Sequence, residues 1–223
     1  MKILALVPAF DEEGRVGDTV HGLRSVTGID DVVVVDGGST DGTAREAAAA
    51  GARVLIARTR VGKGDAMDAA LSRLDPADVY VLADADLGGS AARIRPLLDE
   101  VLAGRADMAV AVLPAPPTGG FGIVKLLARR LLRSLAGIET REPLSGQRVV
   151  TGRCLQACRP IAHGFGAEVG LSADAVRLGF ALSEVPVPLE HRYTRRDLAG
   201  FAHRGRQGID ALRAFAPRAL RLR

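Results

Sequence analysis

The stretch Asp31-Val32-Val33-Val34-Val35-Asp36-Gly37-Gly38-Ser39-Thr40-Asp41 combines a short run of β-branched residues with a turn and the start of a helix. Four consecutive valines are typical of a strand that is buried on both faces, as in the centre of a parallel sheet. The Ser39, Thr40 and Asp41 group supplies side-chain oxygens that can cap the first turn of a helix. The stretch therefore predicts a strand followed at once by a helix, which is the repeating unit of an α/β fold.

The same alternation continues on both sides of this stretch. Short apolar runs recur along the chain, and the segments between them have the length and polarity of surface helices. Parallel strands joined by helices imply right-handed crossovers. We therefore expect an α/β fold with a mostly parallel, twisted sheet flanked by helices. The expected strands are 2–7, 31–35, 53–57, 79–83, 108–113 and 181–189, with an extended segment at 144–150, and the expected helices are 14–25, 41–50, 63–74, 94–103, 123–136 and 168–178.

A proline- and glycine-rich run at 114–120 interrupts this rhythm and predicts a loop. The sequence contains no internal repeat and no low-complexity linker, so we expect one domain over residues 1–223. Its first half, 1–113, carries the regular alternation. Its second half, 114–223, is expected to pack on the end of the same sheet and to finish in a basic helix.

The composition is that of an ordinary globular protein. Of 223 residues, 48% are hydrophobic and 25% are charged, which argues against disorder. Two cysteines cannot form a disulfide framework, and four scattered histidines do not indicate a zinc cluster. The apolar runs are far shorter than the roughly 20 residues that a membrane-spanning helix needs. We expect a cytoplasmic protein, with peripheral attachment to the inner face of the membrane as the alternative.

Positive charge is concentrated at the end of the chain. The formal net charge is +4, whereas residues 191–223 contain nine arginines and two aspartates, a net of +7, so the preceding residues sum to −3. Such a segment can contact phosphate groups, an anionic membrane surface or nucleic acid, or it can be a solvated helix. Nucleic acid is disfavoured as a partner, because 4% aromatic residues offer few platforms for base stacking.

Residues that can carry chemistry gather where the expected strands end. In an open parallel sheet, ligands bind outside the carboxyl ends of the strands. Four segments therefore predict one binding site at a single edge of the sheet. They are Pro8-Ala9-Phe10-Asp11-Glu12-Glu13, Asp36-Gly37-Gly38-Ser39-Thr40-Asp41-Gly42-Thr43, Gly62-Lys63-Gly64 and Asp84-Ala85-Asp86.

The Asp84-Ala85-Asp86 triplet is the centre of this expected site. Two carboxylates two residues apart point the same way in an extended chain and repel unless a cation neutralises them. Mg²⁺ and Mn²⁺ bind a few carboxylates together with substrate phosphate oxygens. A helix cap or a solvated turn is the alternative for the triplet. Lys63 could approach a phosphate, although its segment lacks the first glycine and the Ser or Thr of a Walker A loop.

In this order, the four segments resemble those of GT-A-fold nucleotide-sugar glycosyltransferases. Two branches are similar: glucosyl-3-phosphoglycerate synthase with its mannosyl relative, and the dolichyl-phosphate mannose synthase-like enzymes. Residues 142–147 (Glu-Pro-Leu-Ser-Gly-Gln), 164–171 (Gly-Phe-Gly-Ala-Glu-Val-Gly-Leu) and Glu190-His191-Arg192 favour the first branch. They resemble its P-L-x-G-E, G-Y-G-x-E-I-G-L and A-H-R segments, with Gln147 in place of the glutamate.

The resemblance implies a role for each matching residue. Asp86 and His191 would bind Mg²⁺ or Mn²⁺, and the catalytic group would comprise Asp84, Asp86, Lys63 and Glu168. Glu168 could equally serve only to complement a helix dipole, and His191 could be a surface residue. The nucleotide side would be lined by Pro8, Ala9, Glu12, Asp36, Ser39, Lys63 and Asp84, and the acceptor side by Gly119, Gly120, Ser145, Gly146 and Arg192.

The resemblance also implies a reaction. A hexose, with glucose favoured, would pass from a nucleoside diphosphate sugar such as UDP-glucose to a small anionic acceptor with retention of configuration. A polyprenyl phosphate at the membrane surface is the alternative acceptor, and a catalytically degenerate nucleotide-binding protein is the alternative of another class. The sequence leaves a homodimer open and favours no nucleic-acid partner.

Overall fold

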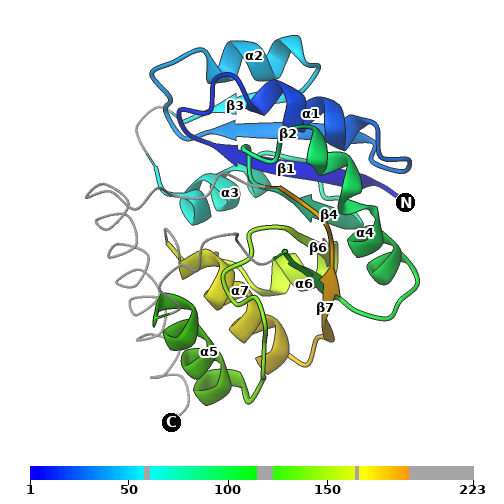
Figure 1. The fold of residues 1–223 in the computed structure, drawn as a ribbon, viewed down its shortest axis with the longest axis vertical. Coiled ribbons are helices and arrows are strands. Elements are labelled where there is room, and N and C mark those ends of the chain that lie inside the picture. Colours follow the sequence, from blue (N-terminus) through cyan, green and yellow to red (C-terminus); the bar gives the residue numbers. More distant parts are fainter. Residues whose placement is uncertain (58–60, 115–122, 164–165, 191–223) are drawn as a thin grey trace.

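The computed structural model describes residues 1–57, 61–114, 123–163 and 166–190. A seven-stranded sheet with helices on both faces forms the centre of the molecule (Figure 1). The elements follow in the order β1 (Ile3–Ala9), α1 (Val16–Arg24), β2 (Asp31–Asp36), α2 (Thr43–Ala49), β3 (Arg53–Ile56), α3 (Lys63–Leu71), β4 (Val79–Leu82), the 3₁₀ helix η1 (Gly88–Ile94), α4 (Arg95–Leu102), β5 (Met108–Val112), α5 (Ile123–Ala136), β6 (Arg148–Thr151), α6 (Gly152–Ala157), α7 (Gly166–Arg177) and β7 (Leu182–Pro186).

The strand order is β3-β2-β1-β4-β6-β5-β7. Pairing is parallel between β1 and β2, β1 and β4, β2 and β3, and β5 and β7, whereas β6 runs antiparallel to both β4 and β5. The prediction of a mostly parallel α/β sheet is confirmed. The second half does not simply extend the end of the sheet, however, because β6 inserts between β4 and β5. This insertion brings the segment before β6 next to the carboxyl end of β4, where Arg148 pairs with Leu82.

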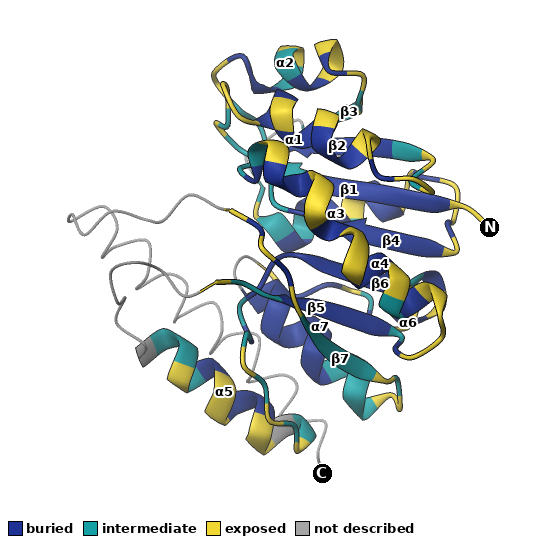
Figure 2. Ribbon diagram, turned by 45° about the vertical axis from the view of Figure 1, so that its right-hand side comes forward, coloured by how far each residue is buried: buried dark blue, intermediate teal, exposed yellow. Residues whose placement is uncertain are grey.

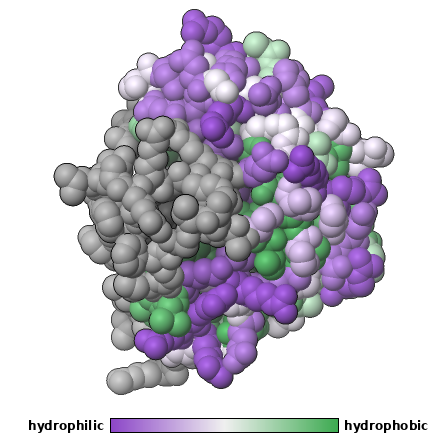
Figure 3. All heavy atoms as spheres, in the orientation of Figure 1, coloured by the Kyte–Doolittle hydropathy of each residue, from purple (hydrophilic) through white to green (hydrophobic). Residues whose placement is uncertain are grey.

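The valine run of β2 is buried on both faces, as its composition predicts. Val32 and Val34 pack in a cluster with α1, η1 and α4, while Val33 and Val35 pack in a second cluster with α3, α6 and α7. The helices accordingly form one layer on each face, with buried strands between them and exposed residues outward (Figure 2). Over α1 and α2 the visible surface is mostly hydrophilic (Figure 3).

Helix α5 lies outside α7 and completes the second half of the described fold (Figure 1). Its bounds match the predicted helix 123–136. Ala128 and Leu132 form a small apolar cluster with Val169 and Ala173 of α7, whereas Leu126 is exposed. In the described part of the chain, no helix is long and apolar enough to cross a membrane.

The structure adds to one predicted segment and corrects another. The helix predicted at 94–103 is confirmed as α4, and it is preceded by η1, which begins at Gly88, so the chain turns helical soon after Asp86. The extended segment predicted at 144–150 forms a strand only from Arg148, because the preceding residues are held in a loop by the distant Glu184 and Asp84 and by the nearby Arg148. The basic helix expected at the end of the chain lies outside the described residues.

Candidate active site

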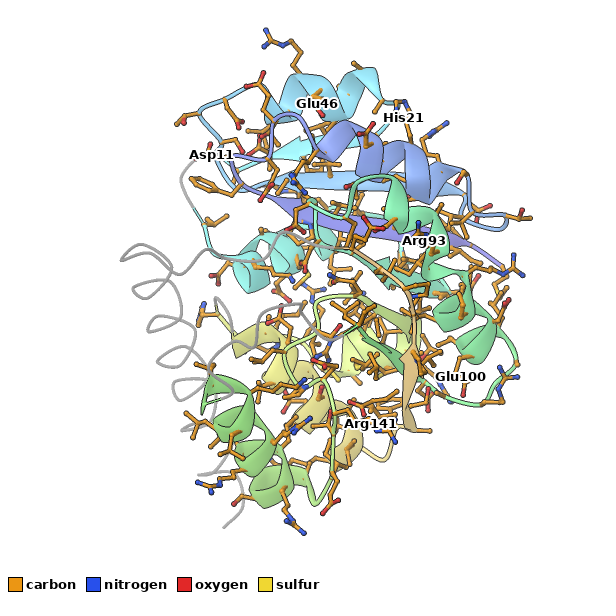
Figure 4. The ribbon with its side chains drawn as sticks, in the orientation of Figure 1. Asp11, His21, Glu46, Arg93, Glu100 and Arg141 are labelled. Carbon is orange, nitrogen blue, oxygen red and sulfur yellow. The ribbon has the colours of Figure 1, made fainter. Side chains whose placement is uncertain are left out.

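The loops that follow β1 and β2 meet at the edge of the sheet where these strands end. The backbone N–H of Asp11 donates to Ser39 Oγ at 3.0 Å, and the Asp11 carboxylate accepts from the N–H of Thr40 at 2.8 Å. Glu12 N–H donates to Thr43 Oγ1 at 2.8 Å. Figure 4 shows Asp11 at this edge. The segments after β1 and β2, which were predicted to share a site, are therefore joined by hydrogen bonds.

Asp36 shapes the second of these loops. Its side chain is buried, and Oδ1 accepts hydrogen bonds from the N–H groups of Gly38 at 3.0 Å and Ser39 at 2.7 Å. Gly38 has a φ of 92°, which a residue with a side chain rarely adopts. The predicted nucleotide-facing residues Pro8 and Ala9 belong to the end of β1, half-buried and buried respectively.

Three predicted catalytic residues meet in a compact charged cluster. Lys63, the first residue of α3, places Nζ 2.5 Å from Asp84 Oδ1 and 2.7 Å from Glu168 Oε1. Asp84 follows β4, and Glu168 lies in the first turn of α7, so the cluster joins both halves of the chain. The exposed side-chain fractions are 21% for Lys63, 34% for Asp84 and 8% for Glu168. The cluster is thus largely shielded from water, with Glu168 the most buried of the three side chains.

The charge state of Lys63 is set by opposing effects. Burial disfavours the ammonium and by itself lowers the pKa of Lys63, whereas the carboxylates of Asp84 and Glu168 favour the ammonium. The carboxylates outweigh burial, so the pKa of Lys63 is raised above its ordinary value. Lys63 is therefore a cation throughout the physiological pH range.

The loop at 142–147 approaches this cluster closely through Gly146. A Cβ atom at this position would lie 2.5 Å from Asp84 Oδ2 and 2.6 Å from Lys63 Nζ, so only glycine fits without displacing them. Gln147 Nε2 donates to Asp84 Oδ2 at 2.9 Å. Ser145 is buried, and its hydroxyl has no hydrogen-bond partner among the described residues. Of the two predicted acceptor residues of this loop, Gly146 thus lies against the charged cluster, and Ser145 directly precedes it.

Gly64 permits a close contact between two parts of the backbone. A Cβ atom there would collide with the backbone carbonyl oxygen of Ala162. The glycine therefore lets α3 pack closely against the segment that leads into α7. This packing helps to bring Lys63 and Glu168 together.

The turn that contains Asp86 is fixed by α1. Thr19 Oγ1 donates to the carbonyl of Ala85 at 2.8 Å and accepts from the N–H of Gly88 at 2.8 Å. Asp86 itself is half-buried. Farther along, Ser90 exchanges hydrogen bonds with the backbone of Glu190, so the described chain ends beside the segment that follows Asp86.

Other predicted residues cannot be placed. His191, Arg192, Gly119 and Gly120 lie outside the described residues. Within the described ranges, no group of three or more His, Cys, Asp or Glu side chains could by itself hold a metal ion. Of the two predicted metal ligands, Asp86 lies within the described residues and His191 lies outside them.

Two residues beside the cluster, Gln147 and Arg148, were not among the predicted site residues. Both are almost fully buried, and Arg148 is the first residue of strand β6, directly before Val149 and Val150. The sequence signal for this pair was a glutamine and an arginine directly before these two apolar residues. An arginine is rarely fully buried unless it has polar partners, so its place in a buried strand would have indicated a polar cluster.

Comparison with known proteins places the chain in a family. The family model "Glycosyl transferase family 2" matches residues 5–158, and the chain belongs to this family. Glucosyl-3-phosphoglycerate synthase of Mycolicibacterium paratuberculosis is 32% identical over 238 residues, covering 94% of this chain and 71% of that enzyme. Undecaprenyl-phosphate mannosyltransferase of Micrococcus luteus is 28% identical over 210 residues, covering 86% of this chain and 85% of that enzyme.

Solved structures agree with the family. Glucosyl-3-phosphoglycerate synthase of Mycobacterium tuberculosis in complex with Mn²⁺, UDP-glucose and phosphoglyceric acid matches with a TM-score of 0.75 and 27% identity. The match covers 96% of this chain and 79% of that chain. The predicted GT-A fold and the predicted glycosyltransferase class are confirmed.

Proposed function

We propose that this protein transfers glucose from UDP-glucose to a small anionic acceptor, with retention of configuration and with Mg²⁺ or Mn²⁺ as cofactor. The observation that carries the proposal is the cluster in which Lys63 contacts both Asp84 and Glu168 beside Gly146. The relative that binds Mn²⁺, UDP-glucose and phosphoglyceric acid supports this choice of donor, cofactor and acceptor class.

The cluster suits a reaction whose leaving group gains negative charge. As the bond between sugar and diphosphate breaks, the ammonium of Lys63 stabilises the charge that develops on the phosphates. The Gln147 amide orients Asp84, whose carboxylate can accept a hydrogen bond from a ribose hydroxyl. Gly146 leaves room for the donor to approach both side chains, since it adds no atoms beyond the backbone.

The described residues fit a divalent ion of the kind that binds with its substrate. Mg²⁺ is usually held by one or two carboxylates together with substrate phosphates, rather than by a complete protein cage. Asp86 supplies one carboxylate in a turn that α1 holds in place. His191 would be the second ligand, and the bond between Ser90 and Glu190 supports this assignment. When bound, the ion would offset negative charge on the diphosphate.

Glu168 is the residue that we assign to the reacting sugar. Its carboxylate is 8% exposed and lies 2.7 Å from Lys63. In such a shielded position, electrostatic stabilisation of a positively charged, oxocarbenium-like sugar is strong. Glu168 is not assigned the proton of the acceptor hydroxyl; in a retaining reaction that proton can pass to the departing diphosphate oxygen on the same face of the sugar.

The test is a transfer assay with radiolabelled UDP-glucose, Mn²⁺ and 3-phosphoglycerate. We expect a charged glucosylated product with an α-linkage, detected by anion exchange and by NMR. Asp86→Asn should lower kcat about 100-fold, as the loss of a group that stabilises developing charge does. Asp99→Asn is a matched control, because Asp99 forms an exposed ion pair with Arg95 on α4.

Three outcomes would contradict the proposal in different ways. Transfer to a polyprenyl phosphate alone would assign the acceptor to the lipid class. Binding of UDP without turnover would indicate a degenerate binding protein, although the intact cluster of Lys63, Asp84 and Glu168 argues against it. Wild-type activity in Asp86→Asn, with normal dependence on Mn²⁺, would remove the proposed metal site.

A further inference from the structure

Arg148 is a charged side chain in the protein interior. It is 1% exposed, and within the described residues its guanidinium makes no ion pair with a carboxylate. Burial lowers the pKa of Arg148 to about 10, although the more distant charges of Glu168, Asp84 and Glu184 act in the opposite direction. Burying a charge costs free energy unless the charge is paired and hydrogen-bonded, and even a buried ion pair can often be replaced by well-packed apolar residues without loss of stability. Stability alone is therefore a poor reason for an arginine here.

The guanidinium joins three parts of the fold. Nε donates to the carbonyl of Ser145 at 2.9 Å, and Nη2 lies 3.5 Å from the carbonyl of Pro143, both in the 142–147 loop. Nη1 donates to Ser172 Oγ of α7 at 2.8 Å and lies 3.5 Å from Met108 Sδ of β5. The planar guanidinium presents its donors in fixed directions. One side chain therefore fixes the loop relative to a helix and to the sheet.

Both the loop and the helix lead directly to the catalytic cluster. Ser172 Oγ donates to the backbone carbonyl of Glu168, one turn earlier in α7, at 3.1 Å. The Glu168 carboxylate then accepts from Lys63. In the loop, Gly146 follows Ser145 and lies against Asp84 and Lys63. Arg148 thus contacts both segments through which the second half of the chain reaches the cluster.

We propose that Arg148 is a positioning residue that holds the 142–147 loop and α7 at the separation required for Gly146 and Glu168 to meet Lys63 and Asp84. The kinetic part of this inference rests on the proposed function, whereas the structural part does not. A displacement of about 1 Å at a reacting group can cost about 100-fold in rate. Loss of Arg148 should therefore lower kcat more than it changes donor binding.

The test compares Arg148→Met, Arg148→Lys and the control Arg153→Met. Methionine has a similar length and suits the neighbouring Met108, while lysine keeps the charge but not the planar fork. Arg153 lies on α6 and pairs with Asp107 in an exposed position. For each protein, kcat and the KM for UDP-glucose are measured with Mn²⁺, together with Tm and hydrogen–deuterium exchange.

We expect Arg148→Met to lower kcat about 10- to 100-fold with KM within about threefold of wild type. Deuterium uptake should rise in residues 140–147 and 166–172 and remain unchanged in β1 and β2. Arg148→Lys should fall between wild type and Arg148→Met in both measurements. Arg153→Met should match wild type in kcat and in the exchange of these segments.

The inference is overturned if folded Arg148→Met keeps the wild-type kcat and the wild-type exchange of the loop. It is also overturned if Arg148→Met and Arg148→Lys lose Tm and activity in proportion while deuterium exchange rises over the whole chain. Arg148 would then stabilise the fold as a whole and not position the loop and α7. If Arg148→Met does not fold, Arg148→Lys decides the matter by the same two measurements. An inactive wild type refutes the proposed function, and the exchange data still test Arg148.

Discussion

Glu168 in α7 accepts a hydrogen bond from Lys63 in α3 at 2.7 Å, across 105 residues of sequence. Lys63 also contacts Asp84 after β4, so one ammonium joins a helix start, a strand end and the second half of the chain. The contact is possible because β6 enters the sheet beside β4 and because Gly64 allows α3 to pack against Ala162. The three residues of the charged cluster therefore come from segments that lie far apart in the sequence and meet only through tertiary packing.

Replacing Lys63 by glutamine should destabilise the protein in a pH-dependent way. The change leaves the carboxylates of Asp84 and Glu168 without their shared cation, and we expect a loss of about 2–4 kcal/mol in the free energy of unfolding near pH 8. The folded-state pKa of Lys63 is raised above the ordinary value of 10.5. Its contribution is therefore complete below pH 10.5 and is lost as pH rises through the folded-state value.

Urea denaturation of wild type and Lys63→Gln at several pH values measures this contribution. The difference between the two proteins should be constant from about pH 8 to 9.5 and should shrink above about pH 10.5. A difference that already disappears between pH 8 and 9 would show that Lys63 is not held as a cation by its two carboxylates.

Gly146→Ala should impair catalysis much more than folding. The new methyl group would lie within 2.5 Å of Asp84 Oδ2 and 2.6 Å of Lys63 Nζ, and both of these atoms are the ends of flexible side chains that can move aside. We expect kcat to fall by about 100-fold, because the cluster is displaced, while Tm changes by only a few degrees. Gly104→Ala is a control for the general effect of the substitution on activity, since Gly104 has a positive φ but open space around it. Wild-type kcat in Gly146→Ala would contradict the close approach of this loop.

Glu184 holds the beginning of the same loop from β7. Its carboxylate accepts the N–H of Arg141 and of Glu142 at 2.8 Å each and also bonds the hydroxyl of Thr140. Glu184→Gln replaces one accepting oxygen with a donor, so we expect a loss of about 1–3 kcal/mol in the free energy of unfolding. Ser183→Ala is the matched control, because the Ser183 hydroxyl is buried and has no hydrogen-bond partner in the described structure. An equal effect of the two substitutions on denaturation midpoints would refute the anchoring role of Glu184.

The strands and the edge that carries the cluster could be predicted from local patterns. The valines of β2 mark a strand buried on both faces, and Lys63 and Asp84 follow from the rule that parallel strands end at a common edge. Glu168 was assigned by family resemblance, because nothing in its own helix indicates that it faces Lys63. Its contact with Lys63 is a consequence of tertiary packing between α3 and the segment before α7.

The 142–147 loop could not be predicted because its shape depends on distant partners. Residues 144–150 were interpreted as extended, yet Glu184 accepts from the N–H of Glu142 and Asp84 accepts from the side-chain amide of Gln147. These two partners lie 42 and 63 residues away in sequence, so their contacts arise only in the assembled sheet. The places of His191, Arg192, Gly119 and Gly120 in the site remain predictions.

Arg159 should stabilise the packing of α3 against the segment before α7, and this contribution to stability should be lost at acid pH. Its guanidinium donates to Asp68 Oδ1 at 2.8 Å and to the Asp68 carbonyl at 3.1 Å, which ties the segment before α7 to α3. The hydrogen bond from Arg159 is the main reason that the pKa of Asp68 is lowered from 3.8. A lowered pKa means that the contribution is present above the unfolded-state value and is lost as pH falls through the folded-state value.

We therefore expect Arg159→Met to lower the free energy of unfolding by about 1–2 kcal/mol at pH 7, with the difference from wild type shrinking below about pH 3.8. Arg95→Met provides the comparison, because Arg95 and Asp99 form an exposed pair one helical turn apart, for which a change of no more than about 0.5 kcal/mol is expected. Denaturation curves between pH 3 and 7 measure both. A stability difference for Arg159→Met that stays constant down to pH 3 would mean that lost packing, and not the bond to Asp68, accounts for its effect.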